Sequence, residues 1–189
     1  MKPLVAQVRN IQSPWGGSKV PRNFSTQLAR QIGESLVVTE LGRRGIVATS
    51  FAGNVPDIDL LAYKDGSSIH LQVKSVRTGS VSFDANRFLL IEFDEDKQIV
   101  RGPDPNIDGD LIYVFVSIGN SAGEDRLFIL EQRQLQEIVR ANHTAWLGKH
   151  GGVRPRNPQS THVSVNLAQL AEFEDYWSLI ETRLEDRRS

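Results

Sequence analysis

Residues 56–76 read PDIDLLAYKDGSSIHLQVKSV, and this stretch decides which fold the chain can adopt. Its apolar residues form two short runs, 58–63 and 69–76, which the sequence KDGS (64–67) separates. An Asp-Gly pair readily takes the positive φ angles of a tight turn. The stretch therefore predicts two adjacent antiparallel strands joined by a hairpin.

Polar side chains fall at fixed places on this predicted hairpin. Gln72 and Lys74 are two residues apart, so they point to the same face of the second strand. The start of the first strand lies opposite the middle of the second, which brings Asp57 or Asp59 beside Gln72. Both aspartates share a face because they are also two apart, so the alternation alone leaves both of them open.

A helix is expected before the hairpin, at residues 26–43, with Ser25 as its N-cap. Glu34 lies on an apolar stripe of this helix together with Val37, Val38 and Leu41. A carboxylate is costly to bury on an apolar face, so Glu34 needs a partner or a chemical task. If this helix packs across the hairpin, Glu34 approaches the aspartates. A short strand is expected next, at 46–51.

The rest of the chain supplies further strands and two helices. Strands are predicted at 87–93, 111–118 and 127–130, and the apolar run at 111–118 suits a strand buried on both faces. Residues 135–139 indicate a helix, whereas 79–110 show no helical period. Phe173, Trp177, Ile180 and Leu184 form one stripe of a C-terminal helix, after a capping box at Asn166 and Gln169.

These elements predict an α/β fold with a central mixed β-sheet flanked by helices. No repeat or linker divides the chain. We expect a basic N-terminal arm at 1–24, followed by a single domain at 25–189 that carries a C-terminal helical extension.

The composition limits the classes of function. The 189 residues include no cysteine, which excludes disulfides, thiolate metal sites and a cysteine nucleophile. The formal net charge is −1, so the chain is not a polycation, but residues 1–50 hold seven Lys and Arg against two Asp and Glu. No apolar run is long enough for a signal peptide or a membrane helix, so we expect no membrane association and a cytoplasmic protein.

The polar groups of the hairpin suit one chemistry. Carboxylate and amide oxygens are hard ligands of the kind that Mg²⁺ prefers. An ammonium group beside them can position or deprotonate water and offset the charge of a phosphate. Together these groups predict metal-assisted hydrolysis of a phosphodiester, with Mg²⁺ as the expected ion and Mn²⁺ as a substitute.

The same residues resemble the PD-(D/E)xK nuclease superfamily, which includes type II restriction endonucleases and Holliday-junction resolvases. The resemblance covers about residues 25–78: the helix with Glu34, the sequence PDID at 56–59, the Asp-Gly turn and the sequence QVK at 72–74. It implies a restriction-endonuclease-like core and a Mg²⁺-dependent endonuclease that acts on DNA. Two features depart from the family pattern, because Gln72 replaces the usual acid and no helix is expected after the Lys74 strand.

The resemblance also implies roles for individual residues. Glu34, Asp59, Gln72 and Lys74 would be catalytic, and the first three would bind the metal. The interval of 13 residues between Asp59 and Gln72 resembles that of resolvases, so Asp59 is preferred over Asp57 as the metal-binding aspartate. The residues expected to contact phosphates are Lys19 and Arg22 in the basic arm and Arg154 and Arg156 in the Gly- and Pro-rich loop at 148–161.

Three other interpretations stay open at this point. In the first, the chain is a nucleic-acid-binding module with an inactive site. In the second, Asp59 and Lys74 form only a surface ion pair. In the third, the chain is a protein-interaction domain. In the last case the helix with Tyr176 and Trp177 would be an oligomer surface, as in a homodimer. The sequence does not distinguish DNA from RNA.

Overall fold

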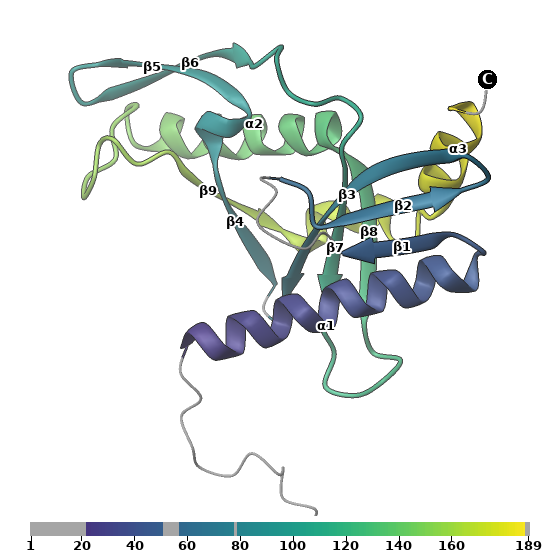
Figure 1. Cartoon of the computed structure of the whole chain (residues 1–189). Helices are drawn as coiled ribbons and strands as arrows, with labels where there is room; N and C mark the ends of the chain where they lie inside the picture. Colours follow the sequence, from purple (N-terminus) through teal and green to yellow (C-terminus); the bar gives the residue numbers. More distant parts are fainter. Residues whose placement is uncertain (1–21, 51–56, 78, 188–189) are drawn as a thin grey trace, which may run out of the picture.

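A five-stranded sheet lies at the centre of the protein, with strand order β1-β2-β3-β7-β8 (Figure 1). The computed structural model describes residues 22–50, 57–77 and 79–187. All neighbouring strands are antiparallel except β3 and β7, which are parallel. The five strands are β1 (Val47–Ser50), β2 (Leu60–Lys64), β3 (Ser67–Val76), β7 (Ile112–Ser117) and β8 (Arg126–Glu131). The prediction of an α/β fold with a mixed central sheet is confirmed.

The β2–β3 hairpin has the predicted turn. Asp65 and Gly66 both have positive φ angles, of 48° and 93°, as a two-residue hairpin turn requires. Leu60 pairs with Leu71, so the next residue outward on β2, Asp59, lies beside Gln72. The expected neighbourhood of these two side chains therefore follows directly from the turn.

The connection between the parallel strands β3 and β7 contains no α-helix in its described residues, 77 and 79–111. Such a crossover is usually a helix. Here it consists of β4 (Ser80–Asp84), the 3₁₀ turn η1 (Ala85–Arg87), β5 (Leu89–Asp94) and β6 (Lys97–Pro103). β5 and β6 form a hairpin that reaches away from the central sheet (Figure 1). β4 instead pairs with β9 (His162–Asn166), which was not predicted.

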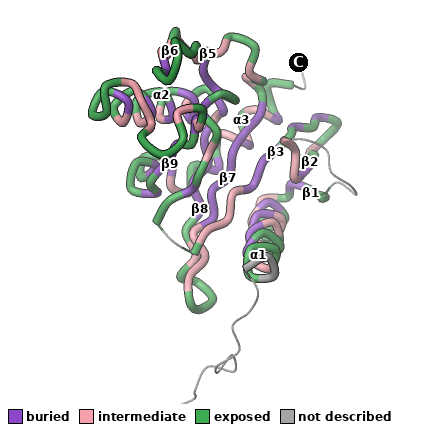
Figure 2. The backbone as a smooth tube through the Cα atoms, turned by 90° about the vertical axis from the view of Figure 1, so that its left-hand side faces the viewer, coloured by how far each residue is buried: buried purple, intermediate pink, exposed green. Residues whose placement is uncertain are grey.

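Two apolar clusters lie on opposite faces of the sheet. Helices α1 (Arg22–Arg43) and α3 (Ser178–Asp186) pack on one face, and helix α2 (Gln132–Lys149), the β4–β9 ribbon and the 3₁₀ helix η2 (Leu167–Phe173) cover the other. β7 contributes to both clusters, as its continuous apolar sequence predicted, and its trace is buried in Figure 2. Within the part of the chain that the structure describes, none of the helices has the length and apolar character needed to cross a membrane.

The first helix begins earlier than predicted. Helix α1 begins at Arg22, so Ser25 lies within it and is not its N-cap. The residues before Ser25 have only slightly lower helix propensity than good helix formers, which allows the longer helix.

The C-terminal stripe is not one helix. The backbone turns sharply at Asp175, where φ is 52°, and separates η2 from α3. Phe173 consequently packs in the cluster on the α2 face, whereas Trp177 packs in the cluster on the α1 face. Trp177 is buried beneath the guanidinium of Arg44, so it is not part of an exposed oligomer surface.

Helix α1 lies in close contact with β3 at Gly33. A Cβ atom on Gly33 would lie 1.7 Å from Ser75 Oγ on β3 and 2.8 Å from Ser75 Cβ. The absence of a side chain at this position therefore lets the helix axis pass directly over β3. This contact determines how near the next residue on α1, Glu34, comes to the start of β2.

We expect Gly33→Ala to destabilise the fold by about 1–3 kcal/mol, because the new methyl group must displace Ser75 or the helix. Gly42→Ala in the same helix is the matched control, since a Cβ atom there meets nothing within 4 Å. That substitution should stabilise the protein by up to about 1 kcal/mol. Urea unfolding measures both, and equal effects of the two substitutions would show that α1 does not depend on the close contact.

Candidate functional site

Asp59 lies where helix α1 meets the β2–β3 hairpin, and its side chain is only 10% exposed. Its Oδ2 atom accepts a hydrogen bond from the backbone N–H of Val73 at 2.8 Å, which extends the β2–β3 contact beyond the last ladder pair. Its Oδ1 atom accepts a hydrogen bond from Arg30 Nη2, also at 2.8 Å. The carboxylate thus connects two strands and a helix.

Glu34 reaches the same region through Arg30. Arg30 Nε donates to Glu34 Oε1 at 2.7 Å, four residues along α1, while the other end of the guanidinium binds Asp59. The hydrogen bond to Glu34 raises the pKa of Arg30 most, and the interactions with Asp59 raise it further. The structure therefore brings Glu34 and Asp59 together, with an arginine between them that the sequence analysis did not identify.

Gln72 and Lys74 share one face of β3, as predicted, but α1 packs on the other face, with Val73 and Ser75, so the expectation that the helix crosses the Gln72 face is wrong. Gln72 is 6% exposed, and its Oε1 atom has no hydrogen-bond partner among the described residues. A buried amide oxygen without a donor costs roughly 1–3 kcal/mol, so this atom is available to a ligand or to a water molecule. Among the described residues of the predicted site, it is a buried oxygen with capacity for a cation.

Lys74 is half-buried beside Gln72. Burial lowers the pKa of its ammonium group, and the charge of Asp59 opposes that effect. The nearby guanidinium of Arg87 lowers the pKa further, whereas Asp57 raises it. A lysine in this position is more easily deprotonated than one in water.

Asp57 occupies a different place from Asp59. Its φ angle is 68°, which turns the chain before β2 begins, and its carboxylate forms an ion pair with Arg87 of η1. Both residues line a separate hollow beyond the start of β2, which does not include Gln72 or Lys74. Asp57 is half-exposed, and Asp59 is the aspartate that is buried next to Gln72.

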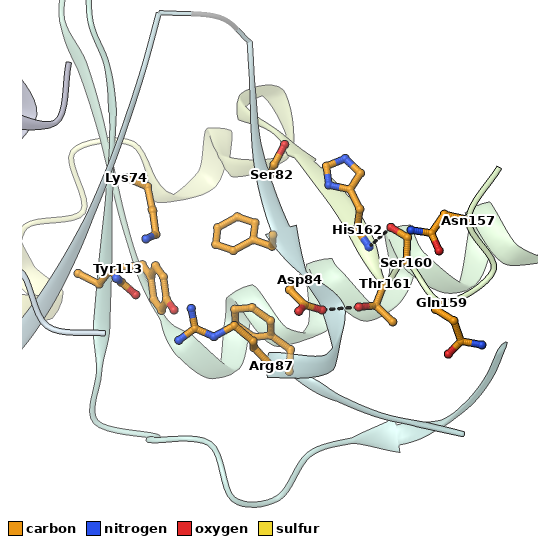
Figure 3. A pocket seen from close by; sticks show the side chains of 13 residues that line it. Lys74, Ser82, Asp84, Arg87, Tyr113, Asn157, Gln159, Ser160, Thr161 and His162 are labelled. Carbon is orange, nitrogen blue, oxygen red and sulfur yellow. Dashed lines mark hydrogen bonds between the residues drawn. The ribbon is translucent and has the colours of Figure 1, made fainter. Parts of the chain in front are cut away.

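A cavity of about 560 Å³ opens in front of Gln72 and Lys74 (Figure 3). Lys74, Arg87 and Tyr113 line the sheet side, and burial raises the pKa of the Tyr113 hydroxyl. The opposite wall comes from β4 and the segment that leads into β9, and it is polar apart from Phe83. That wall contains Ser82, Asp84, Asn157, Gln159, Ser160, Thr161 and His162. A hydrogen bond from Thr161 to Asp84 holds its two parts together.

A second cavity, of about 330 Å³, adjoins the first and shares Asn157 and Ser160 with it. Trp146 and His150 stack there, with ring centroids 3.9 Å apart. Arg154 lies with its guanidinium carbon 4.2 Å from the Trp146 centroid and donates to the carbonyl of His162. Arg156 lines the same cavity and is exposed.

The other predicted phosphate contacts lie at the edge of the described chain. Lys19 falls outside the described residues, and Arg22 is described only as the first residue of α1. The expected basic arm therefore stays a prediction.

Sequence reasoning missed two arginines and the polar wall. Arg30 had a local signal, because it precedes Glu34 by four residues on a helix. Arg87 had none, since it reaches Asp57 across 30 residues of chain. No group of three or more His, Cys, Asp and Glu in residues 22–50, 57–77 and 79–187 is arranged to hold a metal ion. The predicted ligand set differs from such a group because it includes an amide oxygen.

The comparisons with known proteins support the fold. No family model matches the chain, and no curated protein matches it significantly. Among solved structures it is similar to the bacterial homing endonuclease I-Ssp6803I, with a TM-score of 0.51 and 12% sequence identity. The match covers 87% of this chain and 99% of the other. At this identity the likeness shows a shared fold.

Removing the Lys74 charge should stabilise the protein at pH 7. A lysine with a lowered folded-state pKa binds fewer protons when folded than when unfolded, so stability rises with pH between the two pKa values. We expect Lys74→Met to raise the Tm at pH 7 by about 2–4 °C, as about 1 kcal/mol does in a domain of this size. The difference should narrow as the pH approaches 10.5, the ordinary lysine value.

Thermal unfolding at several pH values tests this expectation. Lys149→Met, at an exposed position near the end of α2, controls for the loss of a positive charge alone. A Lys74→Met protein that is less stable than wild type at pH 7 would show that its ion-pair partners outweigh its burial.

Proposed function

We propose that the protein is a metal-dependent nuclease that hydrolyses phosphodiester bonds in DNA, with a PD-(D/E)xK-type site. The observation that carries the proposal is the buried Gln72 Oε1 atom, which has no donor among the described residues, beside Asp59 in the β2–β3 register and on the same strand face as Lys74. An acid, a free amide oxygen and a half-buried amine at the head of a cavity suit phosphoryl chemistry.

The shared fold supports this proposal. The similar structure is that of a homing endonuclease, and nearly its whole length is matched. Fold alone does not imply function, so the assignment depends on Asp59, Gln72 and Lys74. Gln72 and Lys74 line the cavity, and Asp59 lies next to Gln72 in the β2–β3 register.

The donor set fits Mg²⁺, with Mn²⁺ as a substitute. Asp59, Gln72 and Glu34 are the residues that would hold the ion, and all three offer oxygen atoms. Asp57 is the second choice because it is already paired with Arg87. A bound divalent ion would act as a Lewis acid and stabilise the negative charge that develops on the phosphoryl group.

Lys74 is proposed to position the attacking water and to take its proton at Nζ. Burial lowers the pKa of this amine, which makes it a better proton acceptor than a lysine in water. Arg87 faces the same cavity and would contact the phosphate that enters it.

DNA would enter along the two adjoining cavities. Arg156 is exposed beside the second cavity and would contact a phosphate. Arg154 is held against Trp146, so its charge would act on the DNA from a fixed position. Lys19 and Arg22 would extend this basic path if the N-terminal arm also contacts the backbone of the DNA.

The direct test is cleavage of branched, double-stranded and single-stranded DNA with Mg²⁺ or Mn²⁺. We expect Lys74→Ala and Asp59→Asn each to reduce the cleavage rate by about 10²-fold or more. Asp96→Asn in the exposed β5–β6 turn is a matched control and should cleave as wild type does.

Other outcomes separate the alternatives. Cleavage that is equal in all three variants would show that the site is wrongly assigned. DNA binding that survives Lys74→Ala, without cleavage by wild type under either metal, would show a binding module with an inactive site. An RNA duplex and an RNA single strand in the same assay determine whether the substrate is DNA.

Gln72→Glu should make folding more dependent on metal. It adds a carboxylate next to Asp59, and two adjacent like charges repel in the absence of a cation. We expect a lower Tm than wild type without metal and a larger rise in Tm on addition of Mn²⁺, measured by thermal unfolding. Gln134→Glu, at the start of α2, is the control for the same change elsewhere. An equal rise in Tm for wild type and Gln72→Glu would place the metal away from Gln72.

A further inference from the structure

Arg30 occupies the position on Asp59 that a metal ion would need. Asp59 has two oxygens, and the Val73 N–H already binds Oδ2. The guanidinium of Arg30 binds the other oxygen, Oδ1, and also binds Glu34. Two of the proposed ligands therefore share one organic cation.

The charges that pair or interact around Asp59 balance, with Asp84 on the far wall of the cavity as a further acid that acts on Arg87. Glu34, Asp57 and Asp59 supply three negative charges, and the residues that face them supply three positive charges. Those residues are Arg30, Arg87 and Lys74. A divalent ion added to this arrangement would leave two positive charges in a partly buried site, which is unfavourable unless a cation leaves or an anion arrives.

Arg30 is the cation that can leave. Its side chain is 61% exposed, whereas Lys74 is half-buried at the cavity. A long side chain on the outer part of a helix can reorient without disturbing the core. Released from Asp59, its guanidinium would remain beside the site and could form two hydrogen bonds to a phosphate.

We propose that Arg30 is a cation placeholder: it neutralises Asp59 and Glu34 until a divalent ion binds there, and it then moves to a phosphate of the bound DNA. This inference rests on the proposed function. It makes metal binding and DNA binding mutually dependent. A bound metal ion releases the Arg30 guanidinium for a phosphate, and a bound phosphate holds that guanidinium away from the metal ligands. Wild type should consequently bind metal weakly in the absence of DNA.

The experiment measures Mn²⁺ affinity by isothermal titration calorimetry on the full chain without DNA. We expect Arg30→Gln to bind Mn²⁺ about three- to tenfold more tightly than wild type, since the competing charge is gone. Arg43→Gln is the matched control, because Arg43 lies on the same helix and pairs only with Glu40 among the ion pairs found in the described residues. It should bind Mn²⁺ as wild type does.

The second measurement is DNA affinity in Ca²⁺ over a range of salt concentrations. Arg30→Gln should bind DNA more weakly than wild type, with a salt slope smaller by about one phosphate contact. Arg30→Lys keeps one charge but lacks the fork that bridges two carboxylates, so its Mn²⁺ affinity should lie between those of wild type and Arg30→Gln. It also serves if Arg30→Gln does not fold.

Two results overturn the proposal: an unchanged or weaker Mn²⁺ affinity of Arg30→Gln, or an unchanged DNA affinity and salt slope. Asp59→Asn separates this failure from failure of the proposed function. If Asp59→Asn abolishes Mn²⁺ binding while Arg30→Gln matches wild type, only the placeholder is wrong. If Asp59→Asn binds Mn²⁺ as wild type does, or if none of the proteins binds it, the proposed metal site is wrong as well.

Discussion

The Asp59 carboxylate is the contact on which the arrangement of the site depends. One of its oxygens binds the backbone of β3 through the Val73 N–H, and the other binds helix α1 through Arg30. A buried carboxylate needs such partners, because an unpaired charge in this position would be strongly unfavourable. The same two hydrogen bonds place Glu34 and Gln72 on either side of it. The polar residues of the site are thus held together by the requirement to satisfy one acid.

The charge distribution has a consequence for function. The chain as a whole is close to neutral, and the candidate site is close to neutral as well. Tight binding to nucleic acid regardless of the site is therefore not expected. Attraction to a phosphate backbone would instead increase when a divalent ion binds. A site of this kind would hold DNA most strongly in the state that can cleave it.

The sequence predicted the hairpin and the relative positions of Asp59, Gln72 and Lys74, because these positions depend only on local geometry. An Asp-Gly turn sets the register of β2 and β3, and the alternation of side chains then places Gln72 and Lys74 on one face. The opposite wall of the cavity could not be predicted in this way. β4 and β9 are short and about 80 residues apart in sequence, and both contribute side chains to the same apolar cluster. Arg87 follows β4 in η1 and pairs with Asp57 across 30 residues of chain, so it too was missed.

A crystal structure of the protein with a DNA duplex and Ca²⁺ tests the central claim most directly. We expect a Ca²⁺ ion at about 2.3–2.6 Å from an Asp59 carboxylate oxygen and from Gln72 Oε1, which is the usual range of Ca²⁺–oxygen distances. We also expect a phosphate within reach of Lys74. An ion bound elsewhere, with the Asp59 carboxylate unchanged and Gln72 Oε1 without a ligand, would contradict this claim.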